Sequence, residues 1–128
     1  MPKKRSQIDI MNAAIAATKE KIKIPQGDLG RSFKIEMMRD GAHLLGKAVA
    51  EEVYTGKDGM HPEQSYHSTD VTVCNAVDEL FSVEFLDGVS ISMNEKKRFY
   101  ESFESGFDSK KWDIEWERKR KHGIDPWA

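Results

Sequence analysis

The chain has 128 residues, of which 38% are hydrophobic and 33% are charged, and its formal net charge is −2. This length and composition predict a single domain over residues 1–128, and we expect its ends, 1–6 and 124–128, to be flexible. No apolar run approaches the roughly 18 residues that a membrane span needs, which argues against a transmembrane helix. The single cysteine, Cys74, excludes an internal disulfide, so we expect a soluble, cytoplasmic protein.

Charge is distributed unevenly along the chain. Residues 1–50 carry a formal charge of +5, residues 51–95 carry −9 and residues 96–128 carry +2. The basic N-terminal stretch is not followed by the apolar segment of a signal peptide. Such opposite charges either fold against each other within one chain or bring neighbouring copies together.

The first helix is predicted over residues 7–21. Ser6 is a typical N-cap, and Asp9 places an acidic side chain in the first turn, where it interacts favourably with the helix dipole. Apolar residues then recur at spacings of three, four and seven, at Ile8, Met11, Ile15 and Ile22. Pro25 ends this segment.

Residues 26–40 fit two structures. Apolar and polar residues alternate as in a strand, with the apolar positions at Phe33, Ile35 and Met37. The apolar residues from Leu29 to Ala48 also suit one long helix. We favour the strand over residues 31–38, because a two-stranded hairpin predicted further along the chain needs a third strand.

A helix is predicted from Gly41 to Tyr54, with Asp40 as its cap and Gly56 after its end. Three small residues lie four apart on one face of it, at Ala42, Gly46 and Ala50. Small residues at this spacing allow another element to approach closely. The stripe therefore predicts tight packing, and a ligand resting on this face is the alternative.

The segment 55–67 predicts a long loop, marked by glycine and proline. Imidazole and carboxylate groups gather in and just after it, at His61, Glu63, His67 and Asp70. These are the ligand types for zinc or another divalent metal, which would support metal-dependent hydrolysis. Their spacing matches no closed zinc pattern, so this site is an alternative and we expect no cofactor.

A short helix capped by Ser68 or Thr69 is predicted to run to about Leu80, with Cys74 as a buried thiol. The following segment, about 80–93, predicts a β-hairpin. Apolar residues alternate with polar ones at Phe81, Val83, Phe85, Val89, Ile91 and Met93. A three-residue loop ending in a left-handed Gly88 would align all six on one face.

The fold class predicted from this hairpin is α+β, a small antiparallel sheet covered by four to five helices. The alternative is an all-α bundle, because Val77, Phe81 and Phe85 also recur at helical spacing. The exposed edges of such a sheet lack proline and lysine, which favours pairing with a second copy. We therefore expect a homo-oligomer.

Two helices are predicted after the hairpin, one from Asn94 to about Ser105 and one from Asp108 or Ser109 to His122, with Gly106 breaking between them. The last helix carries the predicted partner-binding residues, which are Lys110, Lys111, Trp112, Trp116, Arg118 and Arg120. Tryptophan among basic side chains also suits stacking and phosphate contacts with nucleic acid. Acidic residues in the same helix would repel phosphate, so docking of the tryptophans on the core is favoured over nucleic-acid binding.

No catalytic motif is recognisable in the chain. It has no glycine-rich phosphate loop, no serine in a nucleophile elbow and no Cys-x-x-Cys pair. We therefore predict a small non-enzymatic binding or regulatory protein that acts through protein–protein contacts and self-associates. Nucleic-acid binding and metal-dependent hydrolysis are the two alternatives.

Overall fold

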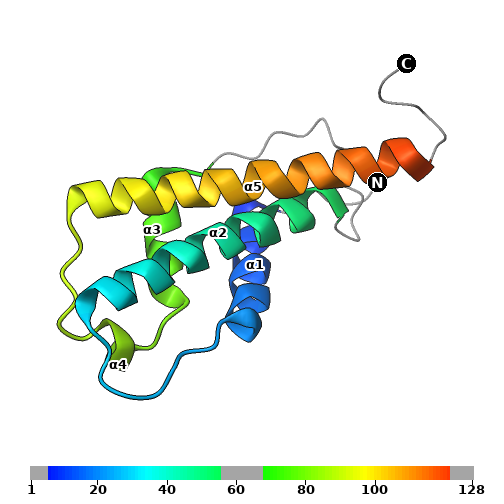
Figure 1. Ribbon diagram of the computed structural model, residues 1–128. Coiled ribbons are helices and arrows are strands. Elements are labelled where there is room, and N and C mark those ends of the chain that lie inside the picture. Colours follow the sequence, from blue (N-terminus) through cyan, green and yellow to red (C-terminus); the bar gives the residue numbers. More distant parts are fainter. Residues whose placement is uncertain (1–5, 56–67, 122–128) are drawn as a thin grey trace.

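The computed structural model describes residues 6–55 and 68–121, and these residues form five α-helices (Figure 1). In chain order they are α1 (Gln7–Lys21), α2 (Arg31–Thr55), α3 (Asp70–Glu79), α4 (Val83–Leu86) and α5 (Met93–Lys121). The described residues contain no β-strand. The predicted α+β fold is therefore wrong, and the alternative, an all-α bundle, is the one that matches.

Helices α2 and α5 are the two longest helices and form the main helix pair of the bundle. They lie side by side and run in the same direction, while α1 and α3 lie across them (Figure 1). Helix α1 packs mainly on α2, and α3 packs on both long helices. Helices α3 and α4 lie between these two parallel helices in chain order.

The two long helices approach each other closely where a glycine of each helix faces the backbone of the other. A Cβ on Gly46 would overlap the carbonyl oxygen of Phe103, and a Cβ on Gly106 would overlap the carbonyl oxygen of His43. The tight packing predicted from the small-residue stripe is therefore confirmed at Gly46. Gly106 does not break a helix as predicted, because α5 needs it here for close contact with α2 and continues to Lys121.

The core lies where the four longer helices meet. Its fully buried large side chains come from α1, α2, α3 and α5, and are Ile10, Met38, Leu45, Val49, Val53, Val73, Val77 and Phe99. Thr18 is also fully buried, and its hydroxyl donates to the Ala14 carbonyl oxygen at 2.7 Å, which satisfies the polar group inside the helix.

The predictions for α1 and α3 are confirmed. The Ser6 hydroxyl accepts a hydrogen bond from the Asp9 amide at 3.1 Å, and α1 spans residues 7–21 as expected. The Thr69 hydroxyl accepts from the Thr72 amide at 3.1 Å and caps α3. The predicted flexible ends lie outside the described residues, apart from the capping Ser6.

The predicted hairpin over 80–93 is replaced by a turn, the short helix α4 and a segment without regular secondary structure. Phe81 and Phe85 both face the core, and their rings stack with centroids 4.7 Å apart. Val83, which a hairpin would bury, is 85% exposed. The alternation was compatible with a helical turn because residues four apart share a face in both structures. Gly88 does adopt a left-handed φ of 74°, in the turn after α4.

The strand predicted over 31–38 is also wrong, because α2 begins at Arg31 and includes the whole segment. Ile35 and Met38 are buried one turn apart, whereas Phe33 is 47% exposed. Asp40 and Gly41 therefore lie inside the helix and do not start it. Without a sheet to complete, nothing in the tertiary structure favours the extended conformation here.

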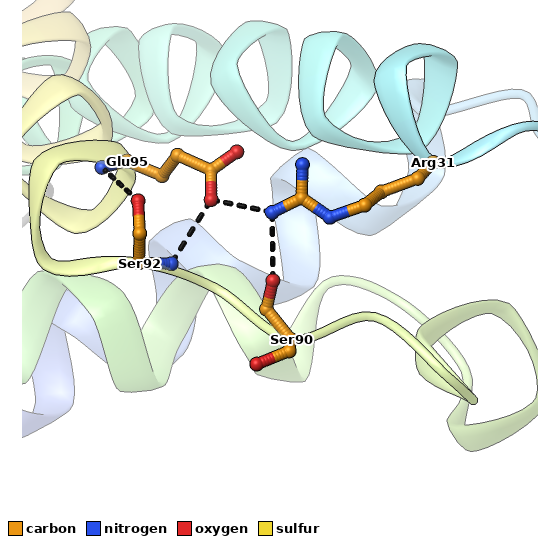
Figure 2. A network of polar contacts seen from close by, with 4 residues as sticks. All are labelled: Arg31, Ser90, Ser92 and Glu95. Carbon is orange, nitrogen blue, oxygen red and sulfur yellow. Dashed lines mark hydrogen bonds and ion pairs between the residues drawn. The ribbon is translucent and has the colours of Figure 1, made fainter.

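The first turns of α2 and α5 are joined by a polar network (Figure 2). Arg31 Nη2 donates to Glu95 Oε1 at 2.6 Å and to the Ser90 carbonyl oxygen at 2.8 Å. Glu95 Oε1 also accepts from the Ser92 amide at 2.9 Å, while the Ser92 hydroxyl accepts from the Glu95 amide at 3.2 Å. This reciprocal pair is a capping box, so Ser92, and not the predicted Asn94, caps α5.

The Arg31 hydrogen bond, followed by that of the Ser92 amide, lowers the pKa of Glu95 from 4.5 to about 2. The carboxylate is therefore charged throughout the neutral range, and the ion pair with Arg31 persists there. The network fixes the first turn of α5, which forms one wall of the groove described next.

Candidate docking groove between α3 and α5

A groove of about 740 Å³ lies between α3 and the first two turns of α5. We call it the docking groove. Its α3 wall is formed by Thr69, Asp70, Val71, Cys74 and Asn75, and its α5 wall by Met93, Asn94, Lys96, Lys97 and Tyr100. Both walls begin at a capped helix start, because Thr69 caps α3 and Ser92 caps α5.

Two large apolar side chains of the groove are exposed to solvent. Val71 is 65% exposed and Met93 is 79% exposed, although each belongs to the first turn of a well-capped helix. Single exposed apolar side chains are common on any protein surface. Apolar side chains that gather beside a groove are instead typical of interaction sites.

The thiol of Cys74 lies in the wall of the groove and is only partly buried. Its Sγ lies 3.6 Å from the Lys96 carbonyl oxygen, to which it donates. Burial raises the pKa of the thiol, and the nearby Lys96 ammonium only partly opposes that rise. The thiol is thus protonated at neutral pH and is a weak nucleophile.

Tyr100 closes the groove on the α5 side. Its hydroxyl lies 3.4 Å from the Ser68 carbonyl oxygen and donates to it. Burial, followed by the negative charges of Glu104 and Asp70, raises the pKa of the phenol. The phenol therefore stays neutral and ties α5 to the residue that precedes the cap of α3.

The rim of the groove is mainly cationic. Lys96 and Lys97 are exposed on its α5 wall, and Asp70 is the acidic residue among its lining side chains. The ammonium group of Lys96 also opposes the rise that burial causes in the pKa of Asp78. The groove thus combines exposed apolar side chains with a lining that carries two lysines and one acid, and Asp78 lies near Lys96 outside that lining.

A second, smaller groove of about 350 Å³ lies between α1 and α3. It shares Thr69 and Asn75 with the docking groove, and Ile8, which is 72% exposed, lies at its edge. Its other walls are more polar, with Gln7 and Asn12 among them. We treat it as a separate surface.

The predicted partner-binding residues lie at the far end of α5 from the docking groove. Trp112 is 60% exposed, and its ring stacks on that of Trp116 with centroids 5.2 Å apart. Lys111 Nζ lies 5.7 Å from the centre of the Tyr54 ring. Of the remaining predicted residues, Lys110 is half-buried, Arg120 is exposed, and the side chain of Arg118 lies outside what the structure describes.

Trp112 does not dock on the core as expected, whereas Trp116 is half-buried. Ile114, between them in sequence, is the buried residue of this stretch, with 8% exposure. The structure therefore brings Trp112 and Trp116 together but presents Trp112 to solvent. Whether a partner uses this surface stays a prediction.

Of the four predicted metal ligands, His61, Glu63 and His67 lie outside the described residues. Asp70 is the first residue of α3 and lines the docking groove. Among residues 6–55 and 68–121, no three histidine, cysteine or acidic side chains are grouped closely enough to hold a metal ion.

Sequence reasoning missed the docking groove. The one local signal for it was an apolar residue in the first turn after a cap, as at Val71 and Met93. That signal could not show that the two helix starts lie side by side, because α3 and α5 are brought together by their packing on α2.

Comparison with known proteins gives no assignment, since no protein-family model, curated protein or solved structure matches this chain. Within the described part of the chain, no helix is both long enough and apolar enough to span a membrane.

Proposed function

We propose that this protein is a non-enzymatic binding protein whose partner is another protein, and that the partner occupies the docking groove. The observation that carries the proposal is the exposure of Val71 and Met93 on the two walls of one groove. Burying such side chains against a partner removes apolar surface from water, which is the main driving force of protein association.

The rim defines the chemistry of the partner. An apolar side chain or short helical turn of the partner would insert between Val71 and Met93. Carboxylates beside it would face Lys96 and Lys97, which steers association and fixes orientation more than it adds affinity. The partner segment is therefore expected to be apolar and acidic.

The proposal is tested with the double variant Val71→Asp/Met93→Asp as bait in affinity capture. Both substitutions place an acid in the first turn of a helix, where the helix dipole favours it, so folding should be preserved. We expect the partner bound by the wild type to be lost, with an affinity weaker by more than about tenfold once the purified pair is titrated.

Ile8→Asp is the matched control. Ile8 is the second residue of α1 and is 72% exposed, just as Val71 is the second residue of α3. This variant should bind as the wild type does. Equal capture by the wild type and the double variant would contradict the proposal.

Nucleic-acid binding remains a second candidate, favoured by the stacked Trp112–Trp116 pair, of which Trp112 is exposed. Single-stranded nucleic acid stacks on such rings, and phosphate contacts weaken steeply between about 50 and 200 mM salt. Tryptophan fluorescence during titration with oligothymidylate at both salt concentrations tests it. Quenching that is absent from Trp112→Ala and decreases with salt would favour nucleic acid.

The self-association predicted from open sheet edges has lost its original reason, since the described residues form no sheet. The exposed Val83 in the turn of α4 is a separate reason to expect self-association.

A further inference from the structure

We infer that the partner in the docking groove is a second copy of this chain, which inserts its α4 turn. We call residues 82–87, which contain α4, the acidic tip. This inference rests on the proposed function and names the partner of the same groove.

The acidic tip presents one apolar side chain among acids. Val83 is 85% exposed, more than any other large hydrophobic residue that the structure describes. Glu84, within α4, and Asp87, which follows it, are both exposed, and the whole segment from Asp78 to Gly88 contains no lysine or arginine. The tip thus has the composition that the rim of the groove requires.

The tip is held in a defined shape before it meets a partner. The Ser82 hydroxyl accepts from the Phe85 amide at 3.2 Å, and Phe85 is anchored by stacking on Phe81. Lys34 Nζ lies 5.5 Å from the centre of the Phe85 ring, a cation–π contact that also helps to hold this ring. A preorganised turn loses little conformational entropy on binding.

The groove matches the tip in size and charge. Its volume of about 740 Å³ is in the range of sites that enclose a small ligand, so it has room for a short helical turn and not only for one valine. Val71 and Met93 would contact Val83, while Lys96 and Lys97 would face Glu84 and Asp87. Every one of these side chains is exposed in the single chain or lines the groove.

A chain cannot fill its own groove with its own tip. The groove lies at the start of α3, beside Thr69 and Asp70, whereas the tip follows the end of α3, a helix of ten residues. Figure 1 shows α4 beyond the far end of α3 from the first turn of that helix. The contact must therefore join two copies, either reciprocally in a closed two-fold dimer or head to tail in rings or open chains of subunits.

Sedimentation velocity of the full chain over a range of concentrations tests the inference. The wild type should exceed the monomer mass of 14.6 kDa as concentration rises. Val83→Asp alone, and Val71→Asp/Met93→Asp alone, should each stay monomeric, whereas Ile8→Asp should associate. High salt or Lys96→Glu/Lys97→Glu should weaken the association, because the contact pairs opposite charges.

Mixing the two monomeric variants gives the sharpest result. The Val83→Asp chain keeps an intact groove and the Val71→Asp/Met93→Asp chain keeps an intact tip. Their equimolar mixture should form one-to-one dimers that grow no further, since each dimer uses its single intact contact. Thermal unfolding followed by circular dichroism confirms that each variant is folded.

The possible failures separate the two proposals. A wild type that stays at 14.6 kDa, or a Val83→Asp chain that still associates, overturns the inference about the second copy. If the groove variant nevertheless loses a captured protein, the groove binds a different protein and the proposed function stands. If the groove variant changes neither association nor capture, both are overturned.

Discussion

The helix crossing at Gly46 and the acidic tip at Val83 are opposite environments for a side chain. At Gly46 even one methyl group would overlap the backbone of α5, although glycine lowers the helix propensity of α2. At Val83 a branched apolar side chain is left 85% exposed. The helix crossing requires glycine at position 46 for close packing. At the tip, packing within a single chain does not require an apolar side chain at Val83.

This difference separates stability from surface chemistry. The crossing holds the two long helices together, so substitutions there should act on folding. The tip and the docking groove can change with little effect on folding, so substitutions there should act on association. The predictions below probe this separation, from the largest expected effect on stability to the smallest.

Gly46→Ala should destabilise the fold by about 3 kcal/mol, because the two helices must move apart to relieve the overlap with the Phe103 carbonyl oxygen. The loss should occur even though alanine is the better helix former. Urea denaturation followed by circular dichroism measures it. Gly30→Ser is the control, because a Cβ there meets no atom within 4 Å and serine is a good N-cap.

Ser92→Ala should cost about 1 kcal/mol, because it removes the hydroxyl that accepts from the Glu95 amide and caps α5. Ser90 gives a matched control two residues away. Its contact with Arg31 is made by its carbonyl oxygen, so Ser90→Ala leaves that hydrogen bond in place. Equal urea midpoints for the two variants would contradict the capping role of Ser92.

Stability should fall as pH is lowered from about 4.5 towards 2, because the pKa of Glu95 is about 2 in the folded chain and near its ordinary value of 4.5 in the unfolded chain. The unfolded state then binds the proton first, which favours unfolding. Above that range the contribution of the carboxylate is fully present. Urea midpoints measured from pH 7 to pH 2 should decrease less steeply for Glu95→Gln than for the wild type.

Val83→Asp should change the free energy of unfolding by no more than about 0.5 kcal/mol, because the side chain is exposed and an acid suits the first position of α4. Phe85→Asp, two residues away, should destabilise strongly, since Phe85 is 6% exposed and would bury an unpaired charge. Similar losses for both variants would indicate the hairpin that the sequence suggested. Denaturation at concentrations below those of association measures both.

Much of the helical structure could be predicted where the signal was local. The caps at Ser6 and Thr69 and the apolar spacing after them located α1 and α3. Prediction failed over 31–38 and 81–93, where alternation and helical spacing coincide. The first segment is set by the packing of α2 on α5, and the second by the burial of Phe81 beside Gly41.

The two surfaces differ in how far the sequence predicted them. Trp112 and Trp116, which were predicted one turn apart, do contact each other, but the docking groove was not predicted. Its residues come from two helix starts that are about 20 positions apart in sequence and meet only in the folded chain. The roles of both surfaces stay predictions until association and capture are measured.

The sequence by itself determined the helix starts at Ser6 and Thr69, because a cap acts within its own few residues. Only the tertiary structure decided that Gly106 continues a helix, that Val83 faces solvent and that Val71 and Met93 share a groove. In each case the deciding partner lies far away in the chain, and neither burial nor close approach can be specified until that partner is in place.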